Sequence, residues 1–107
     1  MKLRIRIPGL DSAALHALDR KARLFLGRHV QSIDCVDISL LERAEAGVQH
    51  AECVVTVTLR EGGAVSVHDD GSRVHRALLR AAWRIDQRRE LGRLRDRIAA
   101  GPARNTF

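Results

Sequence analysis

The stretch from Ala51 to His68 constrains the fold most, because two alternating segments flank a short glycine turn. In the first segment, "AECVVTVTLR", one side is apolar, with Cys53, Val55, Val57 and Leu59. The second, "AVSVH", repeats the alternation with Val65 and Val67, and Glu61-Gly62-Gly63 between them is typical of a tight turn. The pattern predicts two antiparallel strands with one face toward a core.

Two further segments have strand character. Lys2–Ile7, "KLRIRI", alternates charged and apolar residues and ends at Pro8-Gly9. Ser32–Glu42 is rich in β-branched residues, but its alternation shifts phase near Cys35-Val36, which indicates either a bulge or a strand covered on both faces. We expect "RAEAGVQH", which follows it, to be a connection.

Helical periodicity marks two other segments. The first helix is expected to open at Asp11 or Ser12 and to end near Gly27, with one apolar face formed by Leu15, Leu18, Ala22, Phe25 and Leu26. The second should open at Asp70 or Ser72 and run to about Leu91, with Gly92 as a weak point.

The resulting order is β-α-β-β-β-α. A helix between the first two strands implies a right-handed crossover, so those strands should be parallel, and hairpins should add the others antiparallel. We therefore predict an α/β (α+β) fold, a four-stranded mixed sheet with two helices on one face. Residues 1–97 should form a single domain, and 98–107 a flexible tail.

The second helix carries most of the positive charge. Nine arginines and three acids lie between Arg73 and Arg97, so this segment has a net charge of +6, equal to that of the whole chain. At 100° per residue, five arginines fall within an arc of about 120°, separate from the apolar arc. These five form the arginine stripe: Arg73, Arg76, Arg80, Arg84 and Arg88.

A charged helix face is usually a solvated surface, but such faces normally mix both signs. The stripe contains no acid, and arginines one turn apart repel each other, so we interpret it as a surface for phosphates. Two Phe, one Trp and no Tyr are too few rings for a base-stacking surface. Folded RNA is the expected partner; DNA is not, because strands separate the two helices, unlike a helix-turn-helix. No apolar run is long enough to span a membrane.

The other candidate residues have simpler interpretations. His68-Asp69-Asp70 is best explained as a strand end with a helix cap, and no spacing indicates a metal or a catalytic site. Cys35 and Cys53 are expected to be buried free thiols, with a redox pair as the alternative. Leu79 and Trp83 lie on a third side of the second helix, where they either border the core or contact a partner.

The segment Gly63–Leu91, "GAVSVHDDGSRVHRALLRAAWRIDQRREL", resembles the ribosome hibernation promoting factor family, also called ribosome-associated inhibitors or sigma-54 modulation proteins. The resemblance extends over about residues 2–97. Ala77-Leu78 and Arg84-Ile85 match the family pattern. Arg73, His75 and Leu79 depart from it, since the family has Asp, Tyr and an acid there, so the chain looks like a divergent short member.

The resemblance implies a fold like that of a double-stranded-RNA-binding domain. It also implies a cytoplasmic protein that binds the small ribosomal subunit and its 16S rRNA, blocks the mRNA and tRNA channel and inhibits translation under stress. No catalysis, cofactor or metal is expected. The expected RNA-binding residues are Arg20, Lys21, Arg23, Arg73, Arg76, Arg80, Arg84, Arg88 and Arg89.

Two matters stay open at this point. The chain resembles short members, which lack the C-terminal dimerisation domain of long ones, so whether it pairs ribosomes or only inhibits them is undecided, as is its own oligomeric state. The alternative function is an RNA-independent protein-interaction or regulatory domain that uses Leu79 and Trp83.

Overall fold

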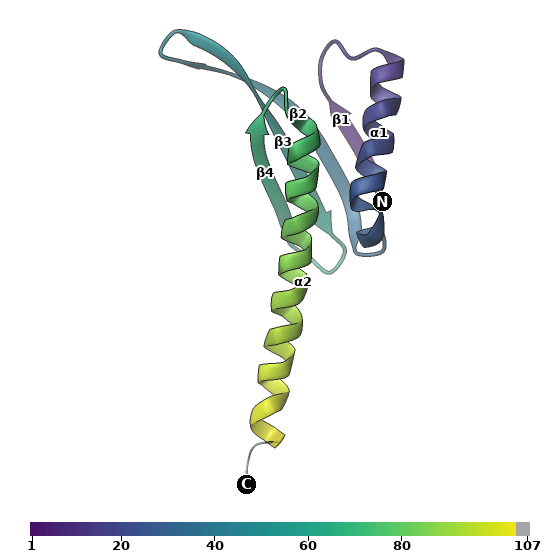
Figure 1. Cartoon of the computed structure of the whole chain (residues 1–107), viewed down its shortest axis with the longest axis vertical. Helices are drawn as coiled ribbons and strands as arrows, with labels where there is room; N and C mark the ends of the chain where they lie inside the picture. Colours follow the sequence, from purple (N-terminus) through teal and green to yellow (C-terminus); the bar gives the residue numbers. More distant parts are fainter. Residues whose placement is uncertain (105–107) are drawn as a thin grey trace.

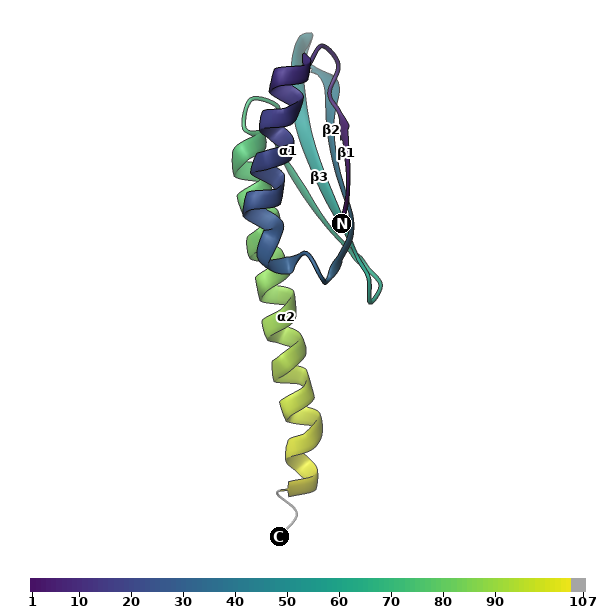
Figure 2. The same ribbon diagram turned by 90° about the vertical axis from the view of Figure 1, so that its right-hand side faces the viewer.

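The computed structural model describes residues 1–104, with side chains through Ile98. Its elements follow the predicted order (Figure 1): β1 (Lys2–Arg6), α1 (Ser12–Leu26), a single 3₁₀ turn η1 (Gly27–His29), β2 (Ile33–Glu45), β3 (Val48–Leu59), β4 (Ala64–Asp70) and α2 (Val74–Arg104). The sheet order is β1-β2-β3-β4, with β1 and β2 parallel and the other pairs antiparallel. Both helices lie on one face of the sheet (Figure 2), so the predicted fold class is confirmed.

The core lies between that face and the two helices. The predicted alternation holds, because Val55, Val57 and Val67 are fully buried and pack with α2 residues Leu78 and Ala81. In α1, Ala22 and Leu26 of the expected apolar face are fully buried, and Leu18 and Phe25 are partly buried against the core. Leu15 is 41% exposed, so this face reaches the core except at its N-terminal end. Periodicity identifies a helix face, but not how far the neighbouring element extends along it.

The β2–β3 hairpin is longer than predicted. The segment expected as a connection continues both strands, and only Ala46 and Gly47 form the turn, with φ of 52° and 79°. Two successive positive φ values are those of a type I′ turn, whose twist matches that of antiparallel strands. The strand register also shifts between Ile33 and Cys35, so the expected irregularity in β2 is a bulge that includes Asp34.

The helix boundaries differ in part from the prediction. Asp11 is the N-cap of α1, where its carboxylate accepts a hydrogen bond from the Ala14 amide at 2.8 Å. α2 begins only at Val74, because Asp70 accepts hydrogen bonds from the amide and hydroxyl of Ser72 and shapes a turn there. These bonds hold the pKa of Asp70 below its usual value.

The C-terminal boundary of α2 is also different from the prediction. α2 continues past Leu91 to Arg104, because Gly92 costs only about 1 kcal/mol in a helix and strong helix formers surround it. The expected tail from residue 98 thus overlaps the last turns of α2, and residues 105–107 lie outside the described residues. Among the described residues, no helix is long and apolar enough to cross a membrane.

Candidate nucleic-acid interface

Three arginines of the stripe lie along the free edge of β4. Arg80 donates a hydrogen bond to the His68 carbonyl at 3.2 Å, Arg84 to that of Ser66, and Arg88 to that of Ala64 at 3.2 Å. Four residues of helix rise about 6 Å, and two residues of strand span about 6.6 Å, so successive arginines meet alternate carbonyls. This set of contacts, here called the arginine ladder, covers an edge that would otherwise be open to pairing with another strand.

Asp69 anchors the N-terminal end of the stripe. It lies on the core-facing side of β4, its side chain is only 3% exposed, and it accepts hydrogen bonds from Arg76, through Nε at 2.7 Å and through Nη2. Arg80 Nη1 lies 3.3 Å from the same carboxylate. The hydrogen bonds from Arg76 are the main reason that the pKa of Asp69 is far below its usual range, and Asp69 in turn raises the pKa of Arg76.

Groups from another element offset part of the repulsion within the stripe. Asp69 and the β4 carbonyls accept hydrogen bonds from its arginines, so the repulsion that the sequence predicts is partly compensated. The signal for Asp69 was present in the sequence, since alternation places it on the same face as Val65 and Val67. Both aspartates lie at the end of β4, as predicted, but the predicted helix cap is wrong: Asp69 binds Arg76, and Asp70 binds Ser72 in the turn before α2.

The stripe nevertheless keeps binding capacity. The side chains of Arg76 and Arg80 are 50% and 45% exposed. A guanidinium has five N–H donors in a planar fork, and the contacts with β4 occupy only some of them. Side chains held in this way are already ordered, so less conformational entropy is lost when they bind a phosphate.

The remaining predicted RNA-binding residues are spread over several surfaces. Arg73 is exposed immediately before α2. On α1, Arg20 is exposed, Lys21 lines an apolar groove of about 330 Å³ between α1 and the start of α2, and Arg23 pairs with Asp19 at 2.7 Å. Arg89 lies on another side of α2, where Nη1 is 3.2 Å from Nδ1 of His29. The structure brings four of the predicted residues into one row, Arg76, Arg80, Arg84 and Arg88.

His29 and Asp86 form a polar contact between η1 and α2 that the sequence did not indicate. His29 is 3% exposed, and its Nε2 lies 3.0 Å from Asp86 Oδ1 without the alignment of a hydrogen bond. Arg28 also pairs with Asp86. Arg89 can only donate, so Nδ1 of His29 is the acceptor and the ring is neutral. Burial lowers the pKa of His29.

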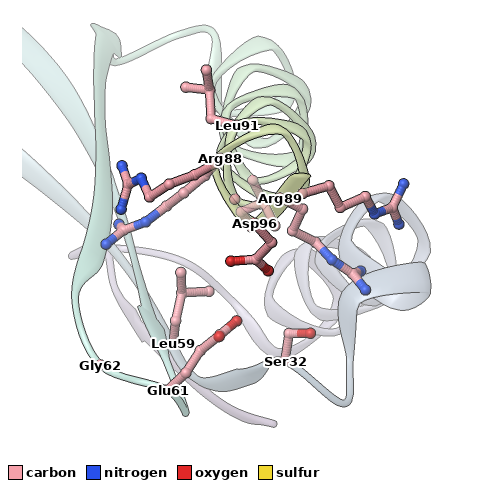
Figure 3. Close-up of a pocket in the computed structure, with 12 residues that line it drawn as sticks. Ser32, Leu59, Glu61, Gly62, Arg88, Arg89, Leu91 and Asp96 are labelled. Atoms are coloured by element: carbon pink, nitrogen blue, oxygen red, sulfur yellow. The ribbon is translucent and has the colours of Figure 1, made fainter. Parts of the chain in front are cut away.

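A pocket of about 510 Å³ lies where α2 passes the end of the sheet (Figure 3). Leu59 and Ile85 supply apolar lining. Arg88 and Arg89 point to opposite sides of it, with the Asp96 carboxylate between them. Four arginines and two acids line the pocket, so it continues the positive surface but is not a uniform phosphate site.

The two thiols are not a pair. Cys35 lies opposite Thr58 and Cys53 opposite Leu40, so they are well separated along the β2–β3 hairpin. Cys53 is buried, and burial raises its pKa to about 11, whereas Cys35 is only partly buried. The redox alternative is therefore wrong. Within the described part of the chain, no group of three potential metal ligands comes together.

Leu79 and Trp83 are exposed, at 45% and 60%, so of the two interpretations the structure excludes burial at the core edge. Trp83 is a large apolar side chain on the outer side of α2, and such residues are common in protein interfaces.

No family model and no curated protein matches this sequence. Among solved structures, the fold is similar to that in the crystal structure of the Thermus thermophilus Protein Y N-terminal domain, with a TM-score of 0.52 and 20% identity. The match covers 82% of this chain and 94% of that chain. At this identity the similarity concerns the fold, and it agrees with the order of elements derived from the sequence. The chain thus has an α+β fold similar to that of the Protein Y N-terminal domain.

Proposed function

We propose that this chain is a cytoplasmic translation inhibitor of the ribosome-hibernation type, which binds the small ribosomal subunit through the arginine stripe. The stripe would contact phosphates of 16S rRNA, and the bound domain would block the channel for mRNA and tRNA. Inhibition would then need no catalytic group, because occupying the channel is sufficient.

One observation carries the proposal: four ordered, partly exposed guanidiniums form a single row beside β4. A row of cations at about 6 Å intervals suits the phosphates of a nucleic-acid backbone better than it suits a small anion. The resemblance in the segment Gly63–Leu91 supports the choice of the ribosome, and the fold is similar to that of the Protein Y N-terminal domain.

Co-sedimentation with isolated 30S subunits tests the proposal. Arg84→Gln/Arg88→Gln removes two charges from the stripe but leaves the contacts of Asp69 intact, and we expect binding to weaken at least about tenfold. The matched control is Arg4→Gln/Arg6→Gln, which makes the same charge change on β1, away from the stripe. Equal loss in both variants would mean that only total charge matters and would contradict a stripe-specific interface.

A lysine variant separates folding from binding. Arg84→Lys/Arg88→Lys keeps both charges, so it should retain most of the 30S affinity even though the hydrogen bonds to β4 change.

The dependence of binding on salt tests direct contact with phosphates. The slope of log affinity against log salt concentration should be shallower for the glutamine variant than for the wild type, by about 0.7–0.9 for each phosphate contact removed. A slope that is unchanged would contradict direct phosphate contact.

Channel occlusion has its own measurement. The wild-type chain should reduce tRNA binding to 30S subunits in proportion to its own occupancy. Full tRNA binding on subunits saturated with the chain would contradict occlusion. Capture of a protein partner that survives RNase, without ribosomes, would instead favour the interaction domain that uses Leu79 and Trp83.

A further inference from the structure

An exposed apolar stripe runs along the outer side of α2. Four residues, here called the outer stripe, are half or more exposed: Trp83 at 60%, Leu91 at 61%, Leu94 at 50% and Ile98 at 64%. At 100° per residue they fall within an arc of about 80°. This arc lies on the side of the helix away from the buried residues Leu78, Ala81 and Ile85.

No element in the described part of the chain covers this stripe. Among the residues whose side chains are described, Ile85 is the last one of α2 in the buried core, and the helix continues for about 28 Å beyond it. In both ribbon views the C-terminal part of α2 extends past the sheet and past α1 (Figures 1 and 2). Large apolar residues that are contiguous and exposed on a helix indicate an interface.

The pattern of the stripe fits another helix. Leu91, Leu94 and Ile98 are separated by three and four residues, which is the a–d–a spacing of a coiled-coil seam. An arc of 80° is narrower than the apolar face of a helix lying on a membrane surface, and Glu90 borders it. We therefore consider α2 of a second copy of this chain as the partner helix.

The charges beside the seam select that partner and its orientation. Glu90 and Arg97 lie on one side of the seam, and Arg88 and Arg95 lie on the other. In a parallel pair, each Glu90 would face Arg95 of the other copy, and each Trp83 would face Arg88 of the other copy, so symmetry gives every contact twice. An antiparallel pair would place the arginine flank of one copy against its equivalent.

We propose that two copies of this chain associate through the outer stripe as a parallel pair of α2 helices. Only Leu91, Leu94 and Ile98 occupy apolar seam positions, because Arg84 and Gln87 stand at the preceding a and d positions. The association is therefore weak and depends on protein concentration. Each helix is already formed and held by its own domain, which removes the cost of helix nucleation from the association. Leu91, Leu94 and Ile98 lie C-terminal to the arginines that contact β4, and Arg88 belongs to both surfaces, because it donates to the Ala64 carbonyl and would face Trp83 of the other copy.

Sedimentation equilibrium of the full chain over a wide concentration range tests the association. We expect a reversible monomer–dimer equilibrium for the wild type and at least a tenfold weaker one for Leu94→Glu/Ile98→Glu. Leu24→Glu is the control, because Leu24 is 76% exposed on α1. A monomer at every concentration, or a dimer unaffected by the double substitution, overturns the proposal. Binding to anionic vesicles without self-association overturns it in favour of a membrane surface.

Charge exchange and disulfide capture test the parallel orientation. Glu90→Arg should weaken the dimer, and adding Arg95→Glu to it should restore the affinity. In a Cys35→Ser background, Ile98→Cys should form a disulfide-linked dimer on mild oxidation, whereas Arg93→Cys, off the seam, should not. The parallel pair is overturned if Arg95→Glu does not restore the affinity of the Glu90→Arg variant and Ile98→Cys does not form a disulfide-linked dimer. Circular dichroism of each variant confirms that α2 is still folded.

Discussion

At the scale of single residues, Asp69 is a nearly buried polar group between β4 and α2. Its carboxylate is nearly buried and accepts hydrogen bonds from Arg76, so Asp69→Asn would leave a guanidinium facing a neutral amide. We expect a loss of about 1–3 kcal/mol in the free energy of unfolding, measured by urea denaturation at pH 7. Asp34→Asn, in the exposed bulge of β2, is the control and should change stability by less than about 0.5 kcal/mol. Equal effects would contradict the role assigned to Asp69.

His29 gives the protein a dependence on pH. Burial holds its pKa below the ordinary value of 6.5, so near that pH the unfolded chain binds a proton that the folded chain does not. The free energy of unfolding should therefore decrease as the pH falls below about 6.5. His29→Gln should flatten this decrease between pH 7.5 and 5.5, whereas His16→Gln, at an exposed position, should leave it unchanged. A wild type whose stability is constant over that range would contradict the prediction.

At the scale of elements, the β2–β3 hairpin depends on its two-residue turn. Ala46 has φ of 52°, which costs free energy for a residue with a Cβ, and Asn followed by Gly is the favoured pair in such a turn. Ala46→Asn should therefore stabilise the chain by about 0.5–1 kcal/mol. Gly47→Ala should destabilise it by about 1 kcal/mol, because Gly47 has φ of 79°. Thermal denaturation of the two variants checks both directions, and shifts of the same sign would contradict the turn assignment.

The arginine ladder should also protect the sheet. Arg84→Leu/Arg88→Leu would remove the donors and the charges beside the carbonyls of Ser66 and Ala64, and we expect self-association through β4. Static light scattering during slow heating should detect it. The Arg84→Lys/Arg88→Lys variant keeps the charge at the edge of β4 and should scatter light like the wild type. If the leucine variant does not aggregate, the arginines are not needed to prevent self-association through β4.

At the scale of the whole molecule, α2 divides into a part that packs and a part that extends beyond the sheet. Because Ile85 is the last core residue of α2, a chain that ends after Glu90 should lose less than about 1 kcal/mol of stability. The same truncation should abolish the self-association proposed above, since it removes Leu91, Leu94 and Ile98. Urea denaturation and sedimentation of the truncated chain measure the two effects separately, and a large loss of stability would contradict the division.

The sequence alone determined the order of elements, the parallel and antiparallel pairings and the core face of β1, β3 and β4. These follow from local periodicity and from the handedness of crossovers, which tertiary contacts rarely override. The arginine stripe was likewise predictable, because side chains three or four residues apart share a helix face.

Tertiary structure decided what surrounds those residues. Only the packing of α2 beside β4 shows that Asp69 and three strand carbonyls hold the stripe, since these groups come from residues 7 to 24 positions away from the arginines they contact, on another element. The exposure of Leu91, Leu94 and Ile98 has the same cause: periodicity defines the faces of a helix, but the length of the sheet determines where the packing stops.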